Sequence, residues 1–263
     1  MGKLESQNAR AISFANCEDK YAELLREFGT TGNLKSGPEN AFYRLKRDAG
    51  GSIWAVSDPA KKLNEDSSGG VLITALRDPT VEAGFTSEVL EIFDQHPDLI
   101  SRLAEYILSS HFPDTLHSDI LNSVGLSSSR SISPSRRRDP NFRPRVLNAY
   151  EYQCAVCGFS LKLGTLPVAL EAAHIKLHQA GGPEEPSNGL ALCSLHHKLF
   201  DLGAFTISDD FCLEESNQTN SAGKNTVSDF RGQKIFLPQE PNEHPDKEYL
   251  RWHKSEVFKG KAR

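Results

Sequence analysis

The chain has 263 residues, of which 38% are hydrophobic and 25% charged, and its formal net charge is −5. These values are typical of a globular protein with one large domain or two modest ones, and they exclude a fibrous or largely disordered chain. No run approaches the roughly 18 consecutive apolar residues that span a bilayer, and the first ten residues contain no apolar segment of the kind that directs secretion. We therefore expect no membrane partner and a cytoplasmic location.

The first 60 residues mix helical and extended patterns. Apolar residues recur at helical spacing through 12–28, most clearly in the latter part, and Gly29 provides a natural end for a helix. Segments 41–46 and 52–56 are short and rich in aromatic and branched residues, with a glycine-containing turn between them. This pattern predicts two strands of a hairpin.

Helical patterns dominate the next part of the chain. The apolar run 71–76 fits either a short buried strand or the start of a helix, because periodicity cannot separate the two over six residues. Three helices are expected within 85–124, with Ser87 as the cap of the first and Pro97 at the start of the second.

A segment rich in serine, proline and arginine follows at 126–141, and such a composition cannot build a core. We place a linker here, between a domain at 1–125 and a domain at 142–263. Six arginines against a single acid, Asp139, lie in and just after this segment: Arg130, Arg136, Arg137, Arg138, Arg143 and Arg145. They would either contact DNA phosphates or simply keep a linker solvated.

After the linker, residues 145–153 read as a short helix that leads into Cys154, and 161–175 contains a strand. The segment 190–201 has a helical pattern, 204–207 and 234–237 look like strands, and 248–260 reads as a helix packed by Trp252 and Phe258.

The five cysteines cannot all pair with one another, and four of the potential metal ligands fall into two tight pairs. Cys154 and Cys157 form one C-x-x-C pair, and Cys193 and His196 form a C-x-x-H pair. Zinc favours four thiolate or imidazole ligands in a tetrahedron, and a site closed by four protein ligands is structural. The spacing therefore predicts a structural zinc ion.

A second set of polar residues overlaps the zinc ligands. His197 and Asp201 are one helical turn apart and would face the same way, which suits a divalent ion such as magnesium or manganese. Because His196 and His197 are adjacent on a helix, they would point about 100° apart and serve two different sites. His174, at the end of a strand, is a candidate general base, because the unperturbed pKa of a histidine side chain lies near neutrality. The amide of Asn188 would pin the loop that orients His174.

The stretches that carry this chemistry read L-E-A-A-H-I at 170–175 and N-G-L-A-L-C-S-L-H-H-K-L-F-D at 188–201. With C-A-V-C at 154–157, they resemble the HNH (ββα-metal) endonucleases, most closely the McrA-like Type IV restriction enzymes that pair a sulfur-binding domain with an HNH domain. The resemblance implies a metal-dependent DNA endonuclease with His174, Asn188 and His197 in the positions of the HNH residues. Many such nucleases place an aspartate or a histidine, as a metal ligand, where this chain has Ala173. Here either Glu171, two residues earlier on the same face of the strand, takes part, or the ion relies on His197, Asp201 and water.

The N-terminal half resembles the sulfur-binding domain of the same family in the segments 23–29, 41–45, 53–56 and 96–100. Arg44, within the second of these, is a candidate DNA contact. Members that read phosphorothioate DNA carry Tyr-Pro just before this element, and this chain has Asn40-Ala41. The resemblance therefore leaves open whether the domain reads phosphorothioate, another modification such as methylated cytosine, or unmodified DNA.

Together, the residues and the resemblance predict an α+β protein with a mostly helical DNA-reading domain and a zinc-stapled HNH nuclease domain. The expected partner is double-stranded DNA, in a prokaryotic cytoplasm. A homodimer is plausible because one HNH centre cuts one strand at a time. The alternative from another class is a DNA-binding zinc protein that uses the HNH scaffold without catalysis.

Overall fold

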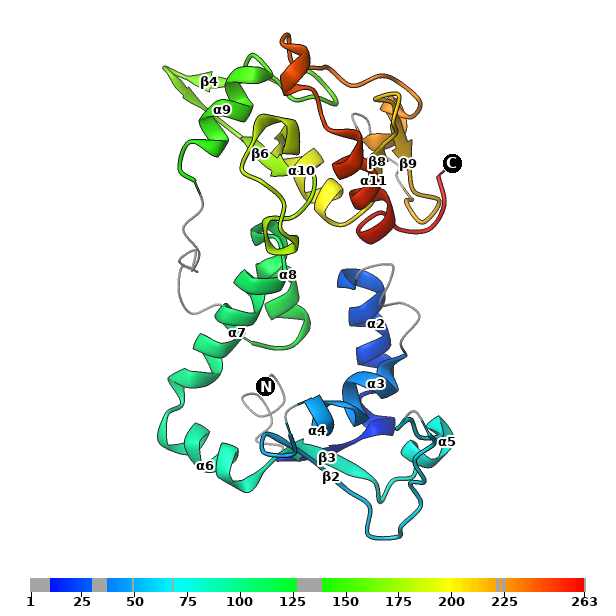
Figure 1. The fold of residues 1–263 in the computed structure, drawn as a ribbon. Coiled ribbons are helices and arrows are strands. Elements are labelled where there is room, and N and C mark those ends of the chain that lie inside the picture. The colour runs from blue at the N-terminus through cyan, green and yellow to red at the C-terminus, as the bar shows by residue number, and fades with distance from the viewer. Residues whose placement is uncertain are drawn as a thin grey trace. The chain divides into compact units, whose positions relative to one another are not determined.

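The computed structural model describes residues 10–29, 37–48, 50–67, 69–126, 139–220, 223 and 226–262 (Figure 1). Its contacts group the described residues into two compact units. The N-terminal unit lies within 1–29, 33–107 and 118–132, and the C-terminal unit within 108–117 and 133–263. Residues 108–117 thus pack with the C-terminal part of the chain. The domain boundaries at 125 and 142 stay a prediction.

The N-terminal unit is built around a three-stranded antiparallel sheet in the order β1-β3-β2. Its strands are β1 (Ala11–Ser13), β2 (Trp54–Ser57) and β3 (Glu82–Phe85). Buried aromatic side chains gather against this sheet: the rings of Phe14 and Phe42 meet edge to face with centroids 5.2 Å apart. The indole Nε1 of Trp54 donates a 2.9 Å hydrogen bond to the main-chain oxygen of Phe42, which satisfies its buried N–H.

Four helices precede or separate these strands: α2 (Glu18–Phe28), α3 (Pro38–Tyr43), α4 (Leu45–Asp48), which contacts β2, and α5 (Ile73–Leu76). The prediction of a strand at 41–46 is wrong, because this segment is helical from Pro38 onward. Phe42 and Tyr43 are adjacent and both buried, at 0% and 4% exposure. Neighbouring side chains of a strand point to opposite faces, whereas neighbours on a helix can share one. The run 71–76, which fitted either a strand or the start of a helix, contains the helix α5 at Ile73–Leu76.

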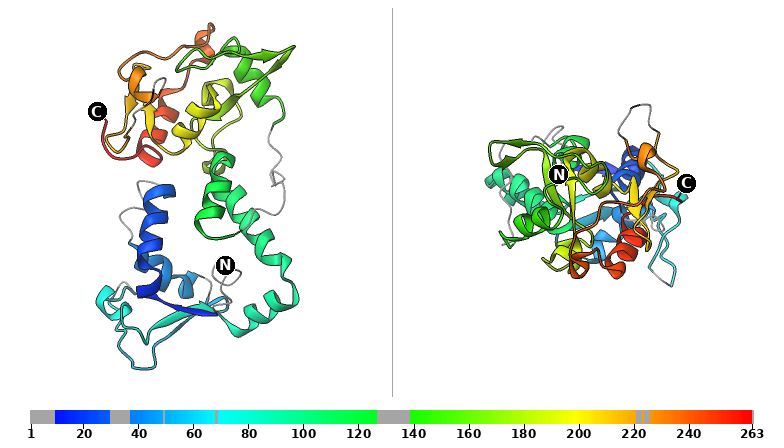
Figure 2. Two further views of the ribbon diagram at one scale, coloured as in Figure 1. Left: turned by 180° about the vertical axis from the view of Figure 1, so that it is seen from behind. Right: turned by 90° about the horizontal axis from the view of Figure 1, so that it is seen from above.

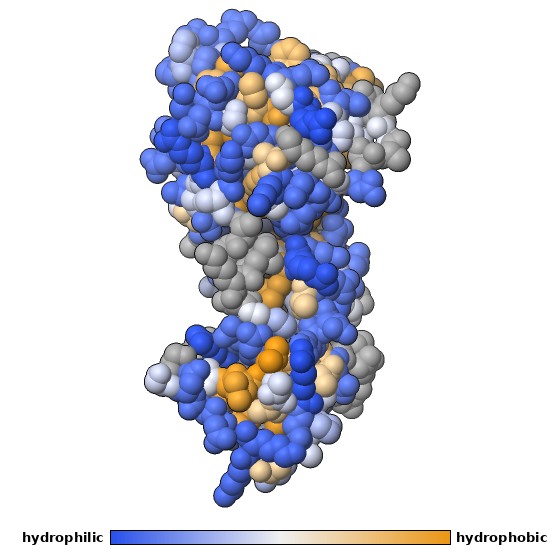
Figure 3. Space-filling view, turned by 90° about the vertical axis from the view of Figure 1, so that its right-hand side faces the viewer, coloured by the Kyte–Doolittle hydropathy of each residue, from blue (hydrophilic) through white to orange (hydrophobic). Residues whose placement is uncertain are grey.

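The three helices predicted within 85–124 are confirmed as α6 (Ser87–Gln95), α7 (Asp98–His111) and α8 (Asp114–Ser123). The residue in the cap position of α6 is Thr86, not Ser87, and Pro97 directly precedes α7. Nothing in the described part of the chain forms a helix both long and apolar enough to cross a membrane. Figure 3 shows one face covered largely by hydrophilic side chains, with apolar ones in small groups.

The C-terminal unit is organised around a hairpin followed directly by a helix. Strands β6 (Leu170–His174) and β7 (Gly189–Cys193) pair antiparallel, and α10 (Ser194–Asp201) starts at the next residue. The helix predicted at 190–201 therefore starts four residues later than expected, because 190–193 belong to β7. These four residues are fully buried or nearly so, and a continuous apolar run fits a buried strand as well as a helix.

The other elements that lie wholly in this unit are α9 (Phe142–Ala149), β4 (Lys162–Leu163), β5 (Leu166–Pro167), the 3₁₀ turns η3 (His178–Ala180), η4 (Pro186–Asn188), η5 (Val227–Phe230) and η6 (Pro241–Glu243), β8 (Phe205–Ile207), β9 (Leu213–Glu215) and α11 (Lys247–Glu256). Figures 1 and 2 show α11 beside β8. The strand predicted at 234–237 is reduced to an isolated bridge between Lys234 and Cys212. On α11, Leu250 and His253 are buried, while the predicted packing residue Trp252 is half-buried.

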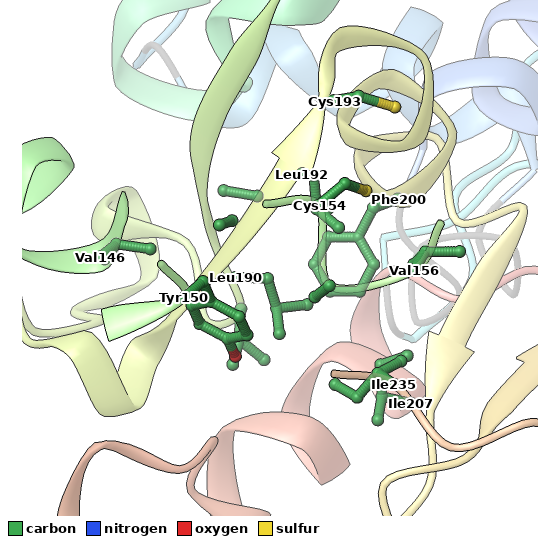
Figure 4. Close-up of a cluster of buried hydrophobic side chains, with 14 of the residues drawn as sticks. Val146, Tyr150, Cys154, Val156, Leu190, Leu192, Cys193, Phe200, Ile207 and Ile235 are labelled. Carbon is green, nitrogen blue, oxygen red and sulfur yellow. The ribbon is translucent and has the colours of Figure 1, made fainter. Parts of the chain in front are cut away.

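Side chains from α9, β7, α10 and β8 converge in one core, shown in Figure 4. Tyr150, Leu190, Phe200 and Ile207 are each no more than 2% exposed, and burying a side chain of this size is worth about 1.5–3 kcal/mol. Gly189 lets α9 lie directly on the strand, because a Cβ there would meet Val146 Cγ2 at 2.4 Å. This packing holds the hairpin rigid where the polar residues gather. The predicted α+β class is confirmed.

Candidate functional site

The hairpin and helix bring the predicted polar residues to one place. Register pairs His174 at the end of β6 with Gly189 at the start of β7, and Leu170 with Cys193. Since α10 follows Cys193 without a loop, its first turns lie beside β6. Glu171, His174, His197 and Asp201 consequently line a single open cleft.

His197 lies between two carboxylates. Its Nδ1 is 2.6 Å from Oε2 of Glu171, and its Nε2 is 3.3 Å from Oδ2 of Asp201. The second oxygen of Glu171 accepts a 2.7 Å hydrogen bond from the Ser194 hydroxyl. Burial alone lowers the pKa of His197, but the charges of Asp201 and Glu171 outweigh it and raise that pKa above its ordinary value.

The two carboxylates differ in their surroundings. The side chain of Asp201 is 3% exposed and accepts a hydrogen bond from the hydroxyl of Thr115. Desolvation raises its pKa, against the opposing charge of His197. The side chain of Glu171 is 40% exposed, and its hydrogen bond with His197 lowers its pKa. Glu171 is therefore an ionised carboxylate open to the cleft, while Asp201 is buried beneath it.

His174 is fixed on two sides. Its ring stacks on Phe142 of α9, with centroids 4.0 Å apart and planes 14° from parallel. Its Nε2 lies 3.2 Å from Oε2 of Glu184, on the loop between the two strands. A further histidine of that loop, His178, also lines the cleft.

Asn188 is completely buried and closes the loop rather than lining the cleft. Its Oδ1 accepts a 2.8 Å hydrogen bond from the main-chain N–H of Lys176. Its Nδ2 donates to the main-chain oxygens of Lys176 and Pro183, at 3.0 and 2.9 Å. A Cβ on Gly182 would meet the Lys176 oxygen at 1.9 Å, so only glycine fits inside this clamp.

Three residues at the start of α8 and just before it also line the cleft, and no sequence pattern indicated them. Pro113, Asp114 and Thr115 form one wall. The amide of Gln179 donates to the main-chain oxygens of Ser109 and Phe112, both at 3.4 Å. No local pattern connects Thr115 with Asp201, because 86 residues separate them.

The second set of ligands forms a separate site. Ligand atoms of Cys154, Cys157, Cys193 and His196 all lie within 4.8 Å of one another. The Nδ1 atom of His196 is 3.2 Å from Sγ of Cys193 and 3.6 Å from Sγ of Cys154. Three sulfurs and one imidazole nitrogen that converge in a largely buried position fit a tetrahedral zinc ion. In the described part of the chain, this is the one group of three or more such residues that converges so closely.

Of the arginines predicted to contact DNA near the linker, only Arg143 and Arg145 lie in the described part of the chain. Arg136, Arg137 and Arg138 lie outside the described residues, as does Arg130. Arg143 donates a 3.0 Å hydrogen bond to the main-chain oxygen of Leu170. Arg145 donates to Asp139 at 2.7 Å and to the main-chain oxygen of Glu184 at 2.5 Å. These two arginines brace the hairpin and its loop, whether or not they also contact DNA.

The N-terminal unit has its own polar pocket. It is lined by Glu39, Asn40, Tyr43, Arg44, Asp66, Gly70 and Val71. Two of the predicted features meet there: Arg44, and Asn40 of the Asn40-Ala41 pair that stands where phosphorothioate readers have Tyr-Pro. The Tyr43 hydroxyl donates to Glu65 at 2.6 Å and accepts from Lys46 at 2.7 Å.

The hairpin β6-β7 followed directly by α10 has the ββα arrangement of an HNH module, and its Cys154, Cys157, Cys193 and His196 cluster could hold a zinc ion. Comparison with family models agrees: residues 154–208 match the HNH endonuclease model, and residues 1–129 match the ScoMcrA-like DNA sulfur-binding domain. The chain therefore combines a domain of the ScoMcrA-like sulfur-binding family with an HNH endonuclease domain.

Among solved structures, the chain is similar to a modification-dependent TagI restriction endonuclease, with 24% sequence identity and a TM-score of 0.34. The match covers 51% of this chain and 41% of that one, so the chain spans less than half of the length of this relative. No curated protein matches the chain.

Proposed function

We propose that this protein is a Type IV-like restriction endonuclease that hydrolyses phosphodiester bonds of DNA with a divalent metal ion. The observation that carries the proposal is the cleft in which His174 faces the same space as Glu171, His197 and Asp201. A base and a group of metal ligands on a ββα hairpin supply what phosphodiester hydrolysis requires.

In this proposal His174 is the general base. Its imidazole takes a proton from a water molecule, the water oxygen forms a bond to phosphorus, and the bond from phosphorus to the leaving deoxyribose oxygen breaks. Phe142 and Glu184 keep the imidazole in place, so that little rotational freedom is lost when DNA binds. Asn188 acts on the reaction only by holding the loop closed.

The residues present fit a divalent cation. Glu171 offers an ionised carboxylate, His197 an imidazole and Asp201 a second carboxylate, and groups of these kinds bind magnesium or manganese. Because the carboxylates contact opposite nitrogens of His197, the one that does not bind the ion would orient the imidazole. A bound ion supplies charge stabilisation at the scissile phosphate.

The N-terminal domain would direct the nuclease to modified or foreign double-stranded DNA in a prokaryotic cytoplasm. Its match to a sulfur-binding family makes phosphorothioate the first modification to test. The polar lining of the pocket at Asn40 and Arg44 keeps methylated cytosine and unmodified DNA as alternatives. Because one HNH centre cuts one strand at a time, a double-strand break would need a homodimer or two successive events.

The experiment is plasmid cleavage with magnesium or manganese, comparing unmodified, phosphorothioated and cytosine-methylated DNA. Cleavage of one modified plasmid alone identifies the modification that is read. Equal cleavage of all three plasmids supports the nuclease activity and shows that cleavage does not depend on a modification. DNA binding without cleavage of any plasmid contradicts the proposal and supports a DNA-binding zinc protein without catalysis.

A further inference from the structure

The loop between β6 and β7 places a carboxylate against the candidate base. Oε2 of Glu184 lies 3.2 Å from Nε2 of His174, and the two side chains are 17% and 13% exposed. An ionised carboxylate can only accept hydrogen bonds, so Nε2 must donate. This contact selects the imidazole tautomer that carries its proton on Nε2 and keeps its lone pair on Nδ1.

We propose that Glu184 is a positioning residue for His174: it fixes this tautomer, so that Nδ1 accepts the proton of the attacking water, and it stabilises the imidazolium that forms. The inference rests on the proposed nuclease function and adds a residue to it. A carboxylate behind a histidine base plays the same two parts in hydrolases of unrelated fold.

The loop is built to hold Glu184 at this point. Arg145 of α9 donates to its main-chain oxygen at 2.5 Å. The neighbouring Pro183 is held by the Asn188 amide, and the main-chain N–H of Asn188 donates to the Glu185 oxygen at 2.9 Å. Glu184 is thus fixed on both sides along the chain. Its exposed neighbour Glu185 has the same side chain and no such contact with His174 in the described structure.

A second histidine shares the carboxylate. Nδ1 of His178 lies 3.0 Å from Oε1 of Glu184, but neither atom is aligned for a hydrogen bond with a described residue. The contact between Glu184 and His174 has the geometry of a hydrogen bond, and the contact with His178 does not, so we assign the hydrogen bond of Glu184 to His174. In the described part of the chain, the charged or titratable residues that contact Glu184 are His174 on β6 and His178 on η3, at its carboxylate, and Arg145 on α9, at its main-chain oxygen.

The test uses Glu184→Gln, with Glu185→Gln as the matched control because it makes the same chemical change one residue away. Two readouts are needed. Long-range ¹H–¹⁵N NMR of the intact protein identifies the tautomer of His174 without requiring activity. Single-turnover cleavage from pH 5.5 to 8.5, at saturating metal, measures the reaction, and a gel shift checks DNA binding.

We expect wild type and Glu185→Gln to carry the His174 proton on Nε2, and Glu184→Gln to shift population to the other tautomer. Glu184→Gln should lower the single-turnover rate on the order of 10- to 100-fold at unchanged DNA affinity.

A wild-type His174 with its proton on Nδ1, or a tautomer unchanged in Glu184→Gln, overturns the inference whether or not the protein cleaves DNA. A rate for Glu184→Gln equal to that of Glu185→Gln overturns it as well. If wild type does not cleave, the proposed function fails, while the NMR comparison still decides whether Glu184 positions His174.

Discussion

Oε2 of Glu171 lies 2.6 Å from Nδ1 of His197. This contact bears on the two alternatives raised by Ala173, which stands where many HNH nucleases have a metal ligand. Ala173 is fully buried in the core and does not line the cleft. Glu171 reaches the site from the same strand and favours the alternative in which it takes part.

Glu171→Gln tests this role, because the amide keeps the shape and removes the charge. We expect cleavage to fall at least about 10-fold, with a higher concentration of magnesium or manganese needed for half-maximal rate. Titration of the rate with metal measures both quantities. A wild-type metal dependence in this variant would leave His197 and Asp201 as the protein ligands.

Removal of one zinc ligand should destabilise the C-terminal unit more than an ordinary point mutation. The four-ligand set ties the turn at Cys154 and Cys157 to Cys193 and His196, at the end of β7 and in α10. Because binding of a structural zinc ion is coupled to folding, we expect Cys157→Ser to cost more than about 3 kcal/mol.

Urea unfolding and metal analysis measure this effect, and Cys212→Ser is the control because Cys212 is half-buried and outside the set. Wild type should retain one zinc ion per chain. Equal stability of the two serine variants, or a purified wild type that holds no zinc, would contradict the assignment.

The clamp around Asn188 should not tolerate a methyl group at position 182. A Cβ there would meet the Lys176 oxygen at 1.9 Å and Nδ2 of Asn188 at 2.8 Å. We expect Gly182→Ala to cost about 1–3 kcal/mol and to slow cleavage, since the same loop carries Glu184. Among the described atoms, a Cβ at Gly223 approaches only Thr226 Cγ2, at the ordinary contact distance of 3.6 Å, so Gly223→Ala should change neither property.

His253 predicts a specific pH dependence of stability. It is completely buried, stacks on Phe200 with centroids 3.7 Å apart, and contacts the Thr206 hydroxyl at 2.9 Å. Burial lowers the pKa of His253 from 6.5 to about 3. The folded protein therefore keeps this imidazole neutral where the unfolded chain would protonate it.

The unfolded state binds the extra proton between pH 6.5 and about 3, so stability falls as pH decreases through this window. The contribution is complete above pH 6.5. In His253→Gln this dependence is absent, and the stability advantage of wild type should shrink from pH 7.5 to pH 5. A constant difference between the two proteins in urea unfolding would show that His253 is not held neutral.

Residues that lie close together because of their spacing along the chain could be predicted from the sequence alone. Two paired ligands predict the zinc set, and His197 with Asp201 one turn later predicts a shared site, because local geometry fixes both relations. The helices of 85–124 were predictable for the same reason, since their apolar residues follow the helical period.

Other features depend on contacts that no local pattern encodes. Thr115 meets Asp201 only through the tertiary fold, and nothing in the sequence distinguishes Glu184 from Glu185. The strand predicted at 41–46 was wrong because burial of both Phe42 and Tyr43 favours a helix over the β propensity of aromatic residues.

The most direct test of the account is single-turnover DNA cleavage by wild type and by His174→Ala, with magnesium or manganese and the modified plasmid that wild type cuts best. We predict cleavage by wild type and a rate at least about 100-fold lower for His174→Ala, with DNA binding and thermal stability unchanged. Equal cleavage by the two proteins, or binding without cleavage by wild type, would contradict the assignment of His174 as the base of a nuclease.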